Sequence, residues 1–217
     1  MLLQNFYLNA LLLMAISYLL GSFPTAFIAG RCKGVDLRYT GSKNIGAMNT
    51  FSKVGKFAGM VVFLADIGKG ALAAFIADRF SAHQFIPMLA VLFAVIGHNW
   101  MPCIGFKGGK GIAAFLGGLL YLAPLSFIFL YFIIVPIALI LLKDTYLAQG
   151  AALFFFSCFL WAWYGDYWLA VFGILITLVY SIKSRALIKT YFTEKRRELH
   201  PVLINIFKPF FKEESRK

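Results

Sequence analysis

Residues 126–142 have the sequence SFIFLYFIIVPIALILL, an uninterrupted run without a charged side chain. A helix needs about 20 predominantly apolar residues to cross the hydrocarbon core of a bilayer, and somewhat shorter runs also cross. This run therefore predicts a membrane-spanning helix. In the whole chain, 61% of the 217 residues are hydrophobic and 14% are charged, whereas a soluble domain has roughly 25% charged residues. The composition predicts an integral membrane protein.

Further apolar runs lie on both sides of this stretch. They are residues Leu2–Gly30, Phe57–Ala77, Phe85–Gly97, Ile112–Ala123, Leu147–Trp163 and Trp168–Ile182. We therefore expect an all-α fold, a polytopic membrane helix bundle with about seven transmembrane helices. Residues 1–182 would form the integral membrane domain, and residues 183–217 a basic cytoplasmic tail. The tail mixes apolar and basic residues, which favours a position at the membrane interface.

The basic residues are concentrated on one side of the predicted bundle. With seven spans, that side carries the segments 31–56, 105–111 and 143–146 and the tail, which together contain 19 of the 21 Lys and Arg residues. Short loops rich in Lys and Arg remain in the cytoplasm. We therefore expect the N-terminus outside the cell and the C-terminus in the cytoplasm.

The charge and the cysteines exclude several kinds of protein. A net charge of +12 would suit a nucleic-acid partner, but the basic residues lie between apolar runs, so we expect no nucleic acid. Cys32, Cys103 and Cys158 lack metal-ligand spacing, and we expect no metal site. The chain contains no Gly-x-Ser-x-Gly motif, so a hydrolase nucleophile of that type is not expected.

The first glycine-rich loop is Gly41-Ser-Lys-Asn-Ile-Gly-Ala-Met-Asn49. Glycines allow backbone amides to approach a ligand closely, and successive amides in a turn can bind an anion. Arg38 and Lys53 flank the loop and add positive charge. The pattern indicates a phosphate site, although a flexible basic loop would have a similar composition.

The second loop extends from Gly97 to Gly111 and contains Phe106-Lys-Gly-Gly-Lys-Gly111. Its two lysines precede a predicted helix, and a helix N-terminus with nearby lysines favours phosphate binding. The spacing is not that of a Walker A loop, because Gly111 follows Lys110 where Ser or Thr would be required. His98 is either a base or the cap of a helix.

Two charged residues interrupt the second apolar run. Asp66 and Lys69 are three residues apart and therefore share one helical face. Charged residues inside a membrane are usually functional and usually paired. We expect Asp66 and Lys69 to form an ion pair, with either a functional or a structural role.

Together these segments resemble the acyl-phosphate-dependent glycerol-3-phosphate acyltransferases of bacteria, the PlsY family. The resemblance rests on the two loops and on three shorter segments, which are Gly21-Ser-Phe-Pro24, Gly34-Val-Asp-Leu-Arg38 and Asp66-Ile-Gly-Lys-Gly70. It implies transfer of an acyl group from acyl phosphate to glycerol 3-phosphate, which gives lysophosphatidate and phosphate without metal, acyl-CoA or cofactor. It also implies seven spans in the bacterial inner membrane and an active site facing the cytoplasm.

The chemistry implied by this resemblance assigns roles to the loop residues. Ser42 and Lys110 are the expected catalytic residues. The expected substrate-binding residues are Arg38, Asn44, Gly46, Asn49, Lys53, His98, Lys107, Gly108 and Gly109. The second loop would hold one phosphate, and the first loop would hold the other and orient the attacking hydroxyl. Two anionic substrates held side by side need fixed cations and amides to offset their repulsion.

The chain departs from the family pattern at several positions. The family usually has Thr at the position of Met48, Arg at that of Ser52 and Val-Ser-Leu-Ala-Ser at residues 145–149. It also has a His-x-x-Asn motif where this chain has Ile182 and Arg185; His200 and Asn205 lie further on, but their spacing differs from that of the motif. Two alternatives remain open, and the departures support only the first. One is a diverged member with a different acceptor or no activity. The other is an anion or lipid transporter, although no internal repeat supports it. The sequence specifies no oligomeric state.

Overall fold

The computed structural model describes residues 2–194, and the regular structure in that range is helical. The elements are α1 (Leu2–Gly21), α2 (Thr25–Arg31), α3 (Ala47–Lys53), α4 (Lys56–Phe80), α5 (Phe85–Asn99), the 3₁₀ turn η1 (Pro102–Ile104), α6 (Ile112–Leu122), α7 (Pro124–Phe129), the π-helical turn η2 (Leu130–Ile134), α8 (Val135–Leu142), α9 (Thr145–Tyr164) and α10 (Tyr167–Glu194). The expected all-α fold is confirmed for these residues.

Five helical segments of the described chain are long and apolar enough to cross a membrane. They are Phe6–Arg31, Lys56–Phe80, Pro124–Leu142, Thr145–Tyr164 and Tyr167–Thr193. The helices α5 and α6 are apolar but shorter. The number, length and composition of these helices are those of a multi-pass membrane protein.

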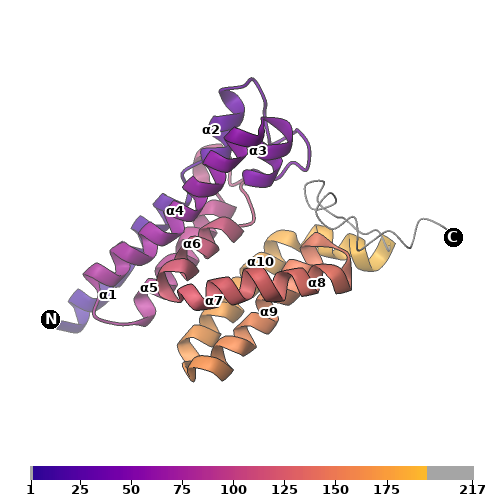
Figure 1. The fold of residues 1–217 in the computed structure, drawn as a ribbon. Coiled ribbons are helices and arrows are strands. Elements are labelled where there is room, and N and C mark those ends of the chain that lie inside the picture. The colour runs from indigo at the N-terminus through magenta and orange to yellow at the C-terminus, as the bar shows by residue number, and fades with distance from the viewer. Residues whose placement is uncertain (1, 195–217) are drawn as a thin grey trace.

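The helices form two groups that pack against each other (Figure 1). In the first group α1 packs on α5, and α4 packs on α5 and α6. In the second, α9 packs on α8 and α10. Helix α10 also contacts α5 and so joins the groups. The largest buried core joins them as well and includes Phe115 of α6 with Phe156 and Tyr180 of the second group.

Small residues allow α4 and α6 to approach closely. A Cβ atom added at Gly70 would lie 1.7 Å from the carbonyl oxygen of Ala114, and one added at Gly117 would lie 1.8 Å from that of Ile67. Lipid tails are as apolar as the helices, so membrane helices associate largely through such close packing. The glycines of the apolar runs therefore fix the distance between the helices that carry the site.

The polar end of the first group is more structured than the sequence suggested. The predicted first span, Leu2–Gly30, is divided into α1 and α2, since Pro24 has no N–H group with which to continue α1. The stretch 31–56, predicted to be a loop, contains the helix α3. In Figure 1, α2 and α3 lie together at one end of the bundle.

The last described helix extends beyond its predicted end at Ile182. Helix α10 continues to Glu194, so the predicted boundary between membrane domain and tail falls inside a helix. Ser184 is buried, and the Lys183 ammonium donates a hydrogen bond to the carbonyl of Asn99. Residues 195–217, with the remainder of the predicted tail, His200 and Asn205, lie outside the described residues.

Candidate active site

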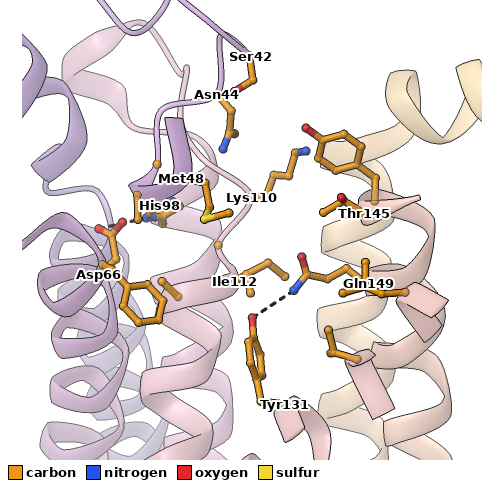
Figure 2. A pocket seen from close by; sticks show the side chains of 18 residues that line it. Ser42, Asn44, Met48, Asp66, His98, Lys110, Ile112, Tyr131, Thr145 and Gln149 are labelled. Carbon is orange, nitrogen blue, oxygen red and sulfur yellow. Dashed lines mark hydrogen bonds and ion pairs between the residues drawn. The ribbon is translucent and has the colours of Figure 1, made fainter. Parts of the chain in front are cut away.

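A cavity of about 340 Å³ lies where the two glycine-rich loops meet the second helix group. Ser42, Asn44 and Gly46 line it from the first loop, and Lys110 lines it from the second. Figure 2 shows the side chains of Asn44 and Lys110 at its polar end. The structure therefore brings both predicted catalytic residues, which are 68 positions apart in the sequence, to one cavity.

Asn49 holds the first loop in shape. Its side-chain NH₂ group donates hydrogen bonds of 3.0 Å to the carbonyls of Thr40 and Asn44, and its carbonyl oxygen accepts one of 3.2 Å from the amide of Ser42. Asn49 is 2% exposed and does not line the cavity. The structure thus places it behind the loop that carries Ser42 and Asn44.

The second loop is packed tightly on the end of α5. The amide of Gly109 donates a 3.1 Å hydrogen bond to the carbonyl of His98. A Cβ atom at Gly109 would lie 2.0 Å from Nε2 of His98, and one at Gly108 would lie 2.2 Å from the His98 carbonyl oxygen. Gly111 caps α6 with a φ of 76°, a left-handed conformation that favours glycine. The glycines are therefore needed for this loop to reach the cavity.

Lys110 lies between the two helix groups. It is half-buried, and its ammonium nitrogen is 3.1 Å from the ring centroid of Tyr146, at the start of α9. Such a cation–π contact is attractive, particularly where water is excluded. The contact holds the ammonium at the cavity that Ser42 and Asn44 also line.

The other predicted cations do not line the cavity. Arg38 donates to Asp36 at 2.7 Å, and this hydrogen bond lowers the pKa of the Asp36 carboxyl to about 2. Lys107 is exposed, with its ammonium 5.3 Å from the ring centroid of Tyr39. Lys53 is exposed at the end of α3. Arg38 and Lys107 lie on the loops and Lys53 on α3, all outside the cavity.

A buried charge cluster lies beneath the second loop. The predicted ion pair is confirmed: the ammonium of Lys69 is 2.7 Å from Asp66 Oδ1, and the side chains are 5% and 1% exposed. Lys69 is also 3.3 Å from Nδ1 of His98. An ammonium group can only donate, so Nδ1 accepts and the proton of neutral His98 lies on Nε2. Asp66 and His98 both line the cavity, and Nε2 lies against Gly109.

Several cavity residues were not predicted as site residues. Thr145, Tyr146 and Gln149 line the cavity from the first turns of α9, and Tyr131 lines it from η2. Their only signal in the sequence is the departure from the family pattern at residues 145–149. Tyr131 has no local signal, because it lies inside the longest uncharged run.

Comparison with known proteins identifies the family. The family model described as glycerol-3-phosphate acyltransferase matches residues 11–194, which include both loops and every described cavity residue. The chain belongs to this glycerol-3-phosphate acyltransferase family. The resemblance inferred from the loops is thereby confirmed.

Individual relatives agree with this assignment. The glycerol-3-phosphate acyltransferase 2 of Dehalococcoides mccartyi (strain ATCC BAA-2266 / KCTC 15142 / 195) is 38% identical over 179 residues, 81% of this chain and 84% of that protein. A glycerol-3-phosphate acyltransferase of Synechococcus sp. (strain CC9902) is 50% identical over 117 residues, 54% of this chain. That match spans only 58% of the Synechococcus protein.

Two solved structures have the same fold. The crystal structure of PlsY, an integral membrane glycerol 3-phosphate acyltransferase, in its glycerol 3-phosphate form has a TM-score of 0.79 and 30% sequence identity, and the match covers 90% of this chain and 98% of that chain. The lysophosphatidic acid form has a TM-score of 0.78 and 29% identity.

Proposed function

We propose that this protein transfers an acyl group from acyl phosphate to glycerol 3-phosphate and forms 1-acylglycerol 3-phosphate and inorganic phosphate. Family membership supports the reaction class. The observation that carries the proposal for this chain is the cavity into which Ser42, Asn44 and Lys110 all project. A cationic, amide-rich polar end joined to an apolar wall suits a substrate with a phosphate head and a fatty chain.

In this proposal the two loops divide the two phosphates between them. Lys110, with the backbone of Gly111 and Ile112 at the start of α6, binds the phosphate of the acyl donor, because a helix N-terminus and a lysine both favour an anion. The predicted phosphate contacts of Gly108 and Gly109 are not part of this proposal, because neither residue lines the cavity and the amide of Gly109 already donates to the carbonyl of His98. The Nε2–H group of His98, a residue that lines the cavity, lies beside Gly109 and adds a neutral donor. Ser42 and Asn44, with the backbone of Gly46, bind glycerol 3-phosphate.

The remaining predicted residues act less directly in this proposal. Asn49 positions the first loop through its three hydrogen bonds. The charge of Arg38 is balanced by Asp36. Lys53 and Lys107 are exposed and provide positive potential at the polar end of the molecule, which raises the local concentration of anionic substrates. That contribution weakens with added salt, since exposed charges are screened beyond about 8–10 Å at physiological ionic strength.

The reaction needs little from the protein beyond orientation and charge. The primary hydroxyl oxygen of glycerol 3-phosphate attacks the carbonyl carbon of the mixed anhydride, and the bond from that carbon to the phosphate oxygen breaks. The hydroxyl proton passes to a phosphate oxygen of the leaving group, which departs as hydrogen phosphate. Ser42 orients the hydroxyl, and Lys110 stabilises the negative charge that develops on the leaving phosphate.

We also propose that the shorter helices α5 and α6 span the membrane with the five longer segments. Seven spans place both glycine-rich loops on the side that carries most of the Lys and Arg residues, which is the cytoplasmic side by the positive-inside rule. The cavity would then face the cytoplasm of a bacterial cell membrane, where glycerol 3-phosphate is available.

The test is an acyltransferase assay on the purified full chain. Acyl phosphate and glycerol 3-phosphate should yield lysophosphatidate and phosphate in equal amounts, and acyl-CoA should not replace the donor. Lys110→Ala should lower kcat/KM by about 30- to 1000-fold, which corresponds to about 2–4 kcal/mol of lost transition-state binding. Lys33→Ala removes an exposed cation from the same side and serves as the control. Phosphate release without lysophosphatidate would instead indicate a diverged acceptor, and a fully active Lys110→Ala enzyme would remove Lys110 from the site.

A further inference from the structure

A hydrogen bond crosses the apolar part of the cavity. The side-chain NH₂ group of Gln149 on α9 donates to the hydroxyl of Tyr131 on η2 at 3.2 Å. Figure 2 shows this bond below Lys110 and Thr145, joining the two walls of the cavity. Phe63, Ile112, Val135 and Leu139 line the cavity as well. The bond is therefore a polar bridge between largely apolar walls.

The local backbone explains why Tyr131 reaches this position. Residues Leu130–Ile134 form a π-helical turn inside the segment Pro124–Leu142. A π turn inserts one extra residue and rotates the side chains that follow, and such turns are frequent at functional sites. In this chain the turn carries Tyr131, the one residue of η2 that lines the cavity.

The bridge lies too close to the polar end for a fatty chain to stop above it. Thr145 and Gln149 both line the cavity, and four residues of an α-helix rise about 6 Å. One leaflet of the hydrocarbon core, about the length of one fatty chain, is roughly 15 Å thick. A long acyl chain whose phosphate is held at Lys110 must therefore pass the bridge, whereas a chain of a few carbons need not.

We propose that the Tyr131–Gln149 hydrogen bond is a gate across the acyl-chain path, which opens to admit long chains and so sets the chain-length preference of the enzyme. This inference rests on the proposed function. Opening the gate breaks one partly buried hydrogen bond, and only donors long enough to cross it bear that cost. The gate thus lowers the preference for long chains relative to short ones.

The gate depends on the length of the glutamine side chain. The family resemblance places Ser at the position of Gln149, and a serine side chain lacks the two further carbons and the amide that reach across to Tyr131. Gln149→Ser and Tyr131→Phe therefore remove the same hydrogen bond from opposite walls. The bridge is a feature of this chain, and its two partners can be tested independently.

The experiment measures kcat/KM for palmitoyl phosphate and for butyryl phosphate, with glycerol 3-phosphate as acceptor, and takes their ratio. Tyr131→Phe and Gln149→Ser should each raise the palmitoyl/butyryl ratio roughly 2- to 10-fold, the factor that one net hydrogen bond represents. The double variant should show no more than the larger single effect, because both changes remove one interaction. Tyr121→Phe, which loses an exposed hydroxyl bonded to Asp78 at 2.8 Å, should leave the ratio unchanged.

Each outcome has a defined meaning. A raised ratio in both single variants without additivity supports the gate. Transfer with an unchanged or lowered ratio in both variants overturns the gate and leaves the proposed function intact. Additive effects overturn the shared bridge. If the unsubstituted protein acylates glycerol 3-phosphate from neither donor, the proposed function and the gate both fail. Should one variant not fold, the other still tests the ratio by itself.

Discussion

Lys69→Met should be among the most destabilising single substitutions in this protein. Lys69 and Asp66 form a 2.7 Å ion pair with both side chains almost completely buried. The ammonium also donates to the carbonyls of Gly21 and Phe23, at 3.3 and 2.9 Å, where α1 ends. Asp66 accepts a further hydrogen bond of 2.6 Å from Thr25. One lysine therefore connects α4 to the break between α1 and α2.

The size of the effect follows from what the substitution leaves behind. Methionine has a similar length but no charge and no donor, so Asp66 would remain buried without its cation. Removing one partner of a buried pair costs about 3–5 kcal/mol. The double variant Lys69→Met/Asp66→Asn removes the stranded charge and leaves the two backbone carbonyls and Nδ1 of His98 without the lysine as donor. The double variant should therefore be more stable than Lys69→Met alone.

The assay is reversible unfolding in mixed detergent micelles, followed by helical circular dichroism. Lys56→Met removes an exposed lysine from the start of the same helix and should change the free energy of unfolding by less than about 0.5 kcal/mol. A cost below about 1 kcal/mol for Lys69→Met, or a further loss of stability on adding Asp66→Asn, would contradict a buried ion pair at this position.

Two further predictions concern helix packing and pH. Gly70→Ala should lower the free energy of unfolding by about 1–3 kcal/mol, because its Cβ would lie 1.7 Å from the Ala114 carbonyl oxygen. Gly68 lies on the same helix, but a Cβ atom there would meet nothing within 4 Å, so Gly68→Ala should not lower it in this way. Equal losses of stability in the two variants would contradict close packing at Gly70. The Asp36 carboxyl should titrate with a pKa of about 2 when followed by carboxyl NMR. Because this pKa is below the ordinary carboxyl pKa of 3.8, the contribution of Asp36 to stability is fully present above pH 3.8 and is lost as the pH falls through 2. Arg38→Ala should move this pKa back toward the ordinary value of 3.8, and an unmoved titration would count against the pair.

The spans were predictable because burial in lipid imposes a local pattern. The run predicted as Ile112–Ala123 is the helix Ile112–Leu122, and the run predicted as Phe85–Gly97 is Phe85–Asn99. The errors fall where tertiary contacts override local composition. The helix α3 forms inside a polar stretch and is anchored by the buried residues Asn49 and Thr50. Helix α10 passes its predicted end, where Lys183 contacts α5.

The candidate site was also predictable only in part. Binding phosphate requires glycines and cations at close spacing, so Ser42, Asn44 and Lys110 could be chosen from the sequence, and the structure brings them to one cavity. Asn49 and Lys107 carried similar signals, but Asn49 supports a loop and Lys107 is exposed outside the cavity. Composition marks a loop as suited to anions but does not determine which of its side chains face inward.

The apolar half of the cavity could not be predicted, because its residues are chemically indistinguishable from residues that face lipid. Tyr131 and Phe132 are neighbours in one uncharged run, yet Tyr131 lines the cavity and Phe132 is 72% exposed. The difference is set by the π turn and by the helix against which it packs, both of which depend on residues distant in the sequence. With the proposed gate, recognition of the phosphates is encoded locally in the two loops, whereas selection of the acyl chain is encoded in helix packing. Substitutions in the loops should then change the turnover of long and short donors together, and substitutions on η2 and α9 should change their ratio.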